Sequence, residues 1–557
     1  MGVARRRRRP AGWTLVGIAV AAVVAGPLIA LPLSFLGEGH AFDQIAASLL
    51  GDALAASLVL AAGVGAGTLV LGGSLAALVS FFDFPGRRWL DWALVLPLAM
   101  PAYVLVFVLL GQYDEAGPLQ RAVRDTLGLQ LPDVRTTVGT IVVLTLVLYP
   151  YVYVLARSAF LGQSRQALEA ARTLGLSHAA AVRRVALPLA RPALAGGVAL
   201  AVMEALADFG AVNLLNYRAL TDAIYRVWYG AFDQAAALQL ATVLVSLTLT
   251  LVALERLLRG RARYHQVLAR GEAVVPVRLR GPAAWLAAAG PVLLLAVVVV
   301  APVAQLVVWA VGSLGDGASA DVLARAAVNS LLLASVAAVV AVAAATVVAY
   351  GPRARPSRLG AGAAHVSALG YAVPGTVVAV AVYVPLAWVD RRIDDATGAG
   401  LLLTGSAVGL VLAYVVRFHA LALFAVQARM GRIHGSLDEA ARSLGADRTR
   451  LLAEIHLPLL WPGIATAALL VFVEVMKELP ATALLRPLGG DTLAIAVWEA
   501  TKDSRFETAA LPALLIVAVG LIPVVMAIRL SRGAPAPLAD RGGTADRTGV
   551  EVPAPSP

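Results

Sequence analysis

Residues 169–175 read EAARTLG, and residues 439–445, 270 positions later, read EAARSLG. Leu187-Pro188 and Leu457-Pro458 follow the two copies at the same distance, and Val185 corresponds to Ile455. A pattern that recurs at a fixed offset indicates two equivalent halves. Each half places one polar segment between long apolar segments, which predicts a membrane protein with a docking site on one side.

The composition supports a membrane protein and excludes an ATP site of the P-loop type. The chain is 60% hydrophobic and 14% charged, whereas soluble domains carry about 25% charged residues. Cysteine is absent, so neither disulfides nor thiolate metal sites are available. A P-loop needs lysine after glycine and before serine or threonine. Lys477 and Lys502, the two lysines, lie in Met-Lys-Glu and Thr-Lys-Asp.

Long apolar runs predict an all-α polytopic membrane protein with about twelve transmembrane helices, six in each half. A bilayer core of about 30 Å needs roughly 20 apolar residues in a helix. The predicted spans are Ala11–Gly37, Ala53–Phe82, Trp92–Tyr113, Thr136–Ala156, Pro192–Asn216, Ala235–Leu254, Ala283–Gly312, Ala326–Pro352, Leu359–Val389, Ala399–Ala428, Trp461–Leu485 and Ala509–Ile528.

The first apolar run could instead be the core of a secretory signal, because Arg5–Arg9 precede it. Its 27 uncharged residues exceed the 7 to about 15 of a signal core, and no Ala-x-Ala cleavage site follows before Glu38. We therefore expect an uncleaved first helix.

The distribution of arginine and lysine predicts which side each loop faces. With a cytoplasmic N-terminus, the inner segments hold 32 of these residues and the outer loops hold 11. Positive charge gathers on the cytoplasmic side, so both Glu-Ala-Ala segments and both termini should be cytoplasmic in a bacterial inner membrane. Because six spans is an even number, the repeats should be parallel and related by an axis along the membrane normal.

The predicted organisation has five parts. They are a cytoplasmic Arg-rich tail and first transmembrane helix (1–50), a first repeated membrane domain (51–258), an Arg-rich linker and seventh transmembrane helix (259–325), a second repeated membrane domain (326–530) and a disordered cytoplasmic tail (531–557).

Each polar segment reads as a short helix, a glycine turn and a second helix that runs into Leu-Pro. Gly175 and Gly445 permit a turn that a side chain would obstruct, and Pro188 and Pro458 mark the start of the next helix. Such an element could lie in a groove of a partner. The alternative is a plain amphipathic connector, and two copies with identical spacing favour docking.

This pattern resembles the coupling-loop motif of type I ABC importer permeases, over nearly the whole chain. Val185 stands where isoleucine is commoner. The resemblance implies that Glu169, Ala170, Ala171, Gly175, Leu187, Pro188, Glu439, Ala440, Ala441, Gly445, Leu457 and Pro458 couple the chain to two copies of an ABC ATPase. It also implies an external solute-binding protein, and ATP and magnesium in the ATPase alone. We expect no cofactor or enzymatic activity in this chain, and contacts with lipid but not with nucleic acid.

Charged residues within the fifth helix of each half form a candidate pathway. The offset pairs Glu204 with Glu474 and Asp208 with Glu478, and Lys477 joins the second group. Residues four apart share a helix face, and intramembrane charges usually face the bundle interior. They could line the path of a cationic solute, or they could pair structurally, Lys477 with Glu474 or Glu478.

The surroundings of these charges resemble iron(III)-type permeases. The resemblance rests on residues 477–482 (KELPAT), 484–487 (LLRP), 491–494 (DTLA), 207–210 (ADFG) and 224–228 (IYRVW). Related thiamine and aminoethylphosphonate permeases are also fused. No metal site can be assigned, because the seven histidines are scattered and form no cluster with metal-ligand spacing. Tyr217, Tyr225 and Tyr229 could meet a hard cation, although interfacial tyrosines usually anchor helices.

Two other functions compete with an importer permease. An ion-coupled secondary transporter would use the intramembrane carboxylates as ion sites, but it would not need a duplicated coupling motif. A membrane scaffold that only tethers ATPases would not need the carboxylates at all.

Overall fold

The computed structural model describes residues 12–36, 46–115, 117–163, 165–259, 276–313, 317–354, 357–398 and 400–532. The predicted Arg-rich tail, most of the Arg-rich linker and most of the disordered tail lie outside the described residues.

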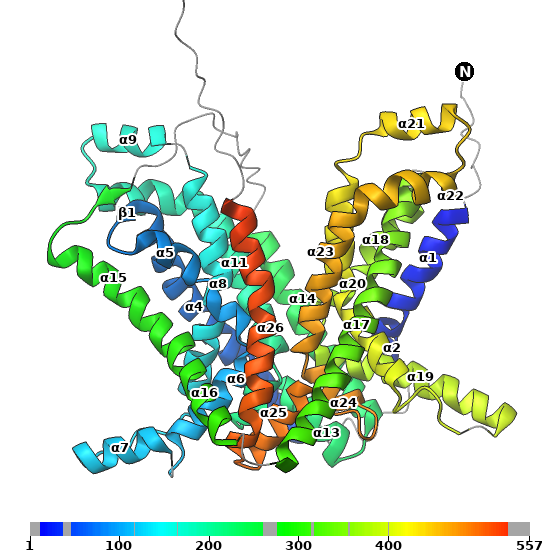
Figure 1. Ribbon diagram of the computed structural model, residues 1–557, viewed down its shortest axis with the longest axis horizontal. Helices are drawn as coiled ribbons and strands as arrows, with labels where there is room; N and C mark the ends of the chain where they lie inside the picture. The colour runs from blue at the N-terminus through cyan, green and yellow to red at the C-terminus, as the bar shows by residue number, and fades with distance from the viewer. Residues whose placement is uncertain are drawn as a thin grey trace, which may run out of the picture.

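The first half begins with α1 and α2 and continues to α14 (Figure 1). Its helices are α1 (Gly12–Ala25), α2 (Ala30–Leu33), α4 (Gly51–Phe81), α5 (Arg87–Ala93), α6 (Ala102–Tyr113), α7 (Pro118–Leu127), α8 (Thr137–Leu161), α9 (Arg165–Thr173), α10 (His178–Ala181), α11 (Leu187–Ala207), α12 (Gly210–Leu214), α13 (Leu220–Gly230) and α14 (Gln234–Arg259).

The second half repeats this order from α15 to α26. Its helices are α15 (Pro282–Leu295), α16 (Ala301–Ser313), α17 (Gly317–Ala354), α18 (Arg358–Ser367), α19 (Gly375–Thr397), α20 (Ala407–Met430), α21 (Gly435–Ser443), α22 (Arg448–Leu451), α23 (Leu457–Met476), α24 (Pro480–Leu485), α25 (Leu493–Lys502) and α26 (Phe506–Arg532). Short π-helical turns, Val182–Ala186 and Leu452–His456, lead into α11 and α23. Two-residue strands β1 (Phe82–Asp83) and β2 (Val277–Arg278) pair in parallel.

Ten helices among the described residues are long and apolar enough to cross a membrane. Counting each of two bent helix pairs as one span gives twelve, the predicted number, and the all-α fold class is confirmed. The bent pairs are Arg87–Ala99 with Ala102–Leu127, at 87°, and Arg358–Ala372 with Gly375–Thr397, at 118°.

The third span of each half was wrongly predicted as one continuous helix. It breaks before α6 and before α19, where Met100 and Val373 are extended. Both residues precede a proline, Pro101 and Pro374, and a residue in that position is disfavoured in the α conformation.

The fifth helices also end earlier than predicted, and one fourth helix begins later than predicted. The helix predicted over Pro192–Asn216 ends at Ala207, and the helix predicted over Trp461–Leu485 ends at Met476. The short helix α12 follows the end of α11, and the short helix α24 follows the end of α23. The span predicted from Ala399 begins at Ala407. Asp208 stands at the break after α11 and Lys477 and Glu478 at the break after α23, and apolar residues resume directly after them. Hydropathy averaged over a span therefore does not reveal the breaks.

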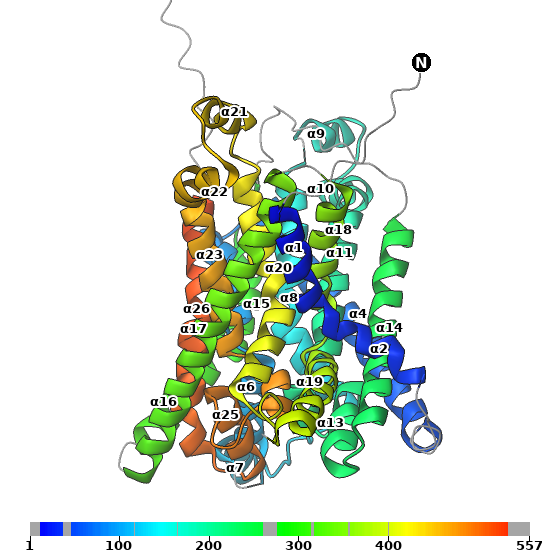
Figure 2. The same cartoon turned by 90° about the vertical axis from the view of Figure 1, so that its right-hand side faces the viewer.

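The two repeats point in the same direction, as predicted. Helices α9 and α21 lie at one end of the bundle, named the motif end, and α13 and α25 lie at the opposite end, named the far end (Figures 1 and 2).

The first helix of the chain packs against the second half. Thr14 Oγ1 donates to the Gly351 carbonyl at 3.4 Å, and the rings of Trp13 and Tyr350 meet edge to face at 5.5 Å between centroids. Gly17 lies close to α17, because a Cβ there would be 3.6 Å from the Val347 carbonyl oxygen. Helix α1 therefore joins the two halves into one bundle.

Candidate transport pathway and repeated segments

The two repeated segments, residues 165–188 and 435–458, have the same local structure. Helix α9 or α21 is followed by Gly175 or Gly445, whose φ angles are 89° and 85°. Left-handed backbone favours glycine, which explains glycine at this position of the pattern. A second short helix then leads through a π-helical turn into α11 or α23. This order matches the predicted helix, glycine turn and helix.

Side chains of the pattern divide into buried and exposed positions in the same way in both segments. Ala171 and Ala441 are each 6% exposed and pack against the body of the protein. Glu169 and Glu439 are exposed at the motif end.

Sequence reasoning missed one feature of the repeated segments. Leu174 and Leu444 are 85% and 86% exposed, directly before the turn glycines. Single exposed apolar residues are normal on protein surfaces, and what distinguishes these two leucines is that they recur at equivalent positions of the repeat. The available signal was a leucine, repeated at the same offset, within an otherwise polar segment.

The five predicted pathway residues line one cavity between the two halves. The cavity has a volume of about 130 Å³, and Glu204, Asp208, Glu474, Lys477 and Glu478 all contribute to its wall. Arg417 of α20, and Tyr103 and Tyr151 of α6 and α8, complete the polar lining. The structure therefore brings together carboxylates that the sequence placed in two separate helices.

Ion pairs within this cavity are unequally distributed between the halves. Lys477 Nζ lies 2.8 Å from Glu474 Oε1, and Arg417 Nη1 donates to Glu478 Oε1 at 3.1 Å. Both pairs belong to the second half. Sequence reasoning proposed the Lys477–Glu474 pair as one alternative but did not connect Arg417 with Glu478.

Asp208 and Glu478 do not lie on the helix faces of Glu204 and Glu474, contrary to the prediction. Each follows the end of its helix and caps the next one. Asp208 Oδ1 accepts from the Ala211 N–H at 2.8 Å, and Glu478 Oε1 accepts from the Ala481 N–H at 3.0 Å. A carboxylate at the start of a helix satisfies backbone N–H groups that lack helical partners.

Glu204 differs from the other three carboxylates of the cavity. Among the described residues it has no ion pair or hydrogen bond, whereas Glu474 and Glu478 pair with cations and Asp208 caps α12. With four acidic and two basic side chains the cavity carries a formal excess of two negative charges. A cation is therefore favoured in this cavity over an anion.

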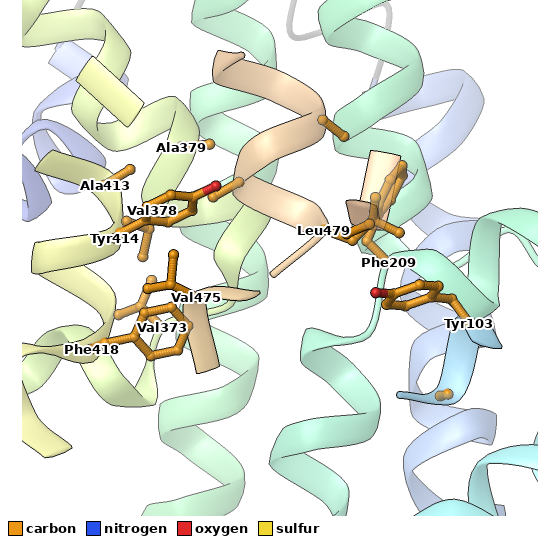
Figure 3. Packing of buried hydrophobic residues seen from close by; sticks show 14 of the residues in the cluster. Tyr103, Phe209, Val373, Val378, Ala379, Ala413, Tyr414, Phe418, Val475 and Leu479 are labelled. Atoms are coloured by element: carbon orange, nitrogen blue, oxygen red, sulfur yellow. The ribbon is translucent and has the colours of Figure 1, made fainter. Parts of the chain in front are cut away.

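Close packing of apolar side chains separates the cavity from the far end. Figure 3 shows Phe209 of the first half beside Leu479 of the second half, with Tyr103 next to them. Phe209 and Leu479 are fully buried, and a Cβ on Gly210 would lie 2.7 Å from Leu479 Cδ2. Glycine at this position permits the two halves to approach.

Hydrogen bonds cross between the halves below this packing. Trp498 Nε1 donates to Asn213 Oδ1 at 3.2 Å, and the Tyr229 hydroxyl donates to the Ala483 carbonyl at 2.8 Å. The first bond joins α25 to α12 and the second joins α13 to α24, so the two bonds are related by the repeat. We name these four residues the far-end latch.

The three candidate tyrosines have structural partners. Tyr225 packs against Phe209 and Trp498, with ring centroids 4.9 and 5.6 Å away. The Tyr217 hydroxyl donates to the Ala56 carbonyl at 2.8 Å, and Tyr229 belongs to the far-end latch. In the part of the chain that the structure describes, no group of three or more His, Asp or Glu could hold a metal ion.

A family model for the inner membrane component of binding-protein-dependent transport systems matches residues 68–264 and 340–533. The chain belongs to this family. Both matched ranges contain one repeated segment and one break after a fifth helix, so this permease holds two family domains in one polypeptide. The match confirms the resemblance inferred from the Glu-Ala-Ala pattern.

Relatives of this permease transport different solutes according to their names. An Fe(3+)-transport system permease protein of Haemophilus influenzae is 26% identical over 528 residues, covering 93% of this chain and 98% of the relative. A probable molybdenum ABC transporter permease protein of Haloferax volcanii is 34% identical over 181 residues, covering 32% and 64%. A sulfate transport system permease protein of Salmonella typhimurium is 29% identical over 188 residues, covering 33% and 67%.

Proposed function

We propose that this permease forms the whole translocation path of an ATP-driven importer and carries iron(III) delivered by an external binding protein. The motif end and both termini face the cytoplasm, where two copies of a separate ATPase bind the repeated segments. ATP hydrolysis takes place in those subunits and not in this chain.

The exposed side chains of Leu174 and Leu444 are the observation that supports binding of an ATPase to the repeated segments. They lie at the same end of the bundle, on rigid glycine turns, and they are equivalent under the internal repeat. Two related sites for one kind of partner fit this arrangement, and a self-contained secondary transporter has no use for them.

The charge of the cavity supports a cationic solute. The formal excess of two negative charges in the cavity disfavours sulfate or molybdate, since like charges in a confined site of low dielectric repel strongly. A relative that aligns over 93% of the chain is named as an Fe(3+)-transport permease, whereas the sulfate and molybdenum relatives align with about one third of the chain. With no preformed metal cluster among the described residues, the solute would make only transient contacts.

Uptake by proteoliposomes tests this function. The chain is reconstituted with its ATPase, ATP is enclosed, and binding protein loaded with iron(III), thiamine, molybdate or sulfate is added outside. We expect ATP-dependent uptake of iron(III) alone. Uptake of another solute would contradict the assignment to iron, and uptake driven by an ion gradient without ATP would contradict an ABC importer.

Glu204→Gln tests the role of the cavity in the same assay. Removing the carboxylate that has no direct ion pair among the described residues should lower iron uptake by about tenfold, a factor that corresponds to roughly 1.4 kcal/mol, while the ATPase stays bound. Glu507→Gln, an exposed carboxylate at the start of α26, is the matched control and should leave uptake unchanged. Equal uptake by the two variants would remove Glu204 from the pathway.

A further inference from the structure

Asp438 lies in the first turn of α21, directly before the Glu-Ala-Ala pattern, and is 8% exposed. Arg353 of α17 donates to both carboxylate oxygens, from Nε to Oδ2 at 2.8 Å and from Nη2 to Oδ1 at 3.1 Å. His456 Nε2 lies 2.9 Å from Oδ1. The carboxylate therefore joins the second repeated segment to a membrane-spanning helix and to the turn that begins α23.

Hydrogen bonds connect the three groups through the Asp438 carboxylate, while the buried Nδ1 of His456 has no hydrogen-bond partner in the described part of the chain. A carboxylate bound by Arg353 can only accept, so the Nε2–H of His456 is the donor. His456 is fully buried and its ring packs against Tyr350, with centroids 5.5 Å apart. Arg353 Nη2 also donates to the His434 carbonyl at 3.3 Å, which fixes the residue that precedes α21.

Electrostatics agree with this geometry. Burial, the largest single cause, raises the pKa of Asp438, but hydrogen bonds from Arg353 and His456 and the charge attraction of these two side chains together lower the pKa below its usual value. Bidentate contacts between arginine and a carboxylate add geometric specificity as well as energy. The Asp438 carboxylate thus connects α21 to α17 and to the turn before α23.

The first repeated segment cannot form this arrangement. The residues 270 positions before Asp438 and His456 are Leu168 and Ala186, whose side chains have no hydrogen-bonding groups. Other contacts hold this segment: the rings of His178 and Phe82 are 5.4 Å apart, and Gln163 Nε2 donates to the Ala186 carbonyl at 2.9 Å. The two segments share a backbone path but differ in how they are attached.

We propose that Asp438, Arg353 and His456 are positioning residues, together named the Asp438 clamp, which fix α21 rigidly to the membrane helices and make the two ATPase contacts inequivalent. The inference that the clamp transmits the conformational change of an ATPase rests on the proposed function. The inference that α21 is held more firmly than α9 is independent of the proposed function.

Spin labels at matched positions test the attachment directly. Thr173 and Ser443 are equivalent, are both exposed, and donate to the carbonyls of Ala170 and Ala440 at 2.9 and 2.7 Å. The chain has no cysteine, so Thr173→Cys or Ser443→Cys each gives one labelled site in the full chain in nanodiscs. The label at 443 should be less mobile than the label at 173.

Asp438→Asn should raise the mobility of the label at 443 to the level at 173 and leave the label at 173 unchanged. Arg353→Lys keeps the charge but loses the bidentate contact, so it should raise the mobility of the label at 443 by a smaller amount. This variant replaces Asp438→Asn in the test if Asp438→Asn does not fold. Arg450→Gln, which removes an exposed pair with Glu454 in the same segment, should change neither label. Equal mobility of the two labels in the parent, or no response to both clamp variants, would overturn the proposal.

Reconstitution with the ATPase tests the mechanical role. Asp438→Asn should keep the ATPase bound but lower solute transported per ATP by about tenfold, equivalent to roughly 1.4 kcal/mol of lost coupling. The exchange variant Arg353→Asp with Asp438→Arg should restore part of the amount of solute transported per ATP. A parent chain that binds no ATPase would contradict the proposed function and leave the label result standing. An unchanged ratio in Asp438→Asn would contradict the role in coupling.

Discussion

The indole N–H of Trp498 donates to Asn213 Oδ1 at 3.2 Å, although the two residues belong to different halves of the chain. Tyr229 donates to the Ala483 carbonyl at 2.8 Å in the opposite sense. Together with the buried pair of Phe209 and Leu479, these bonds close the far end below the acidic cavity. Opening of the path towards the far end must break them.

The far-end latch should therefore control access to the cavity. Trp498→Phe with Tyr229→Phe removes two hydrogen bonds of about 1 kcal/mol each, which would shift the closed-to-open equilibrium by roughly 30-fold. The measurement is the rate at which an impermeant thiol reagent, added at the far end, labels Ala207→Cys in the cavity wall.

Tyr217→Phe is the control for this experiment, because Tyr217 donates to Ala56 within the first half. It should leave the labelling rate near that of the parent. If the latch variant and the control are labelled equally fast, the latch does not hold the far end closed.

The two ion pairs of the cavity should differ in their contribution to stability. Glu478 is 4% exposed in its side chain, so Arg417→Gln leaves a buried charge without its cation and should cost about 3 to 5 kcal/mol. Glu474 and Lys477 are 36% and 22% exposed, so Lys477→Gln should cost no more than about 1 kcal/mol. Thermal unfolding in detergent measures both, and equal shifts of Tm would contradict the ranking.

The pH dependence of the Asp438 clamp follows from the lowered pKa of Asp438. A carboxyl group with a lowered folded-state pKa adds stability above its unfolded pKa, and this stability is lost as the pH falls through the folded value. The stability difference between the parent and Asp438→Asn should be constant from about pH 5 to pH 8 and shrink only below about pH 4. A difference that already shrinks between pH 8 and pH 6 would exclude an ionised, hydrogen-bonded Asp438.

Much of this architecture could be predicted from the sequence because its signals are local. Uncharged runs give the spans, and Gly175 and Gly445 give the turns of the repeated segments, where only glycine adopts the observed φ without strain. The common offset of Glu204 and Glu474 also predicted that their helices are equivalent.

The remaining features depend on contacts between distant residues. Arg417 and Glu478 are 61 residues apart, and Arg353 and Asp438 are 85 apart, so no local pattern pairs them. The break at Asp208 was missed because Phe209 and Leu214 continue the apolar run. Its signal was chemical: an acidic residue three positions before Ala211, where it caps a new helix.

Docking of an ATPase through the repeated segments is the central claim, and co-purification tests it most directly. The tagged parent, extracted from membranes that contain the ATPase, should retain two ATPase copies. Glu169→Arg with Glu439→Arg reverses the charge of both exposed glutamates and should release them while the permease stays folded. If the double variant retains the ATPase as firmly as the parent, the assignment of these segments is wrong.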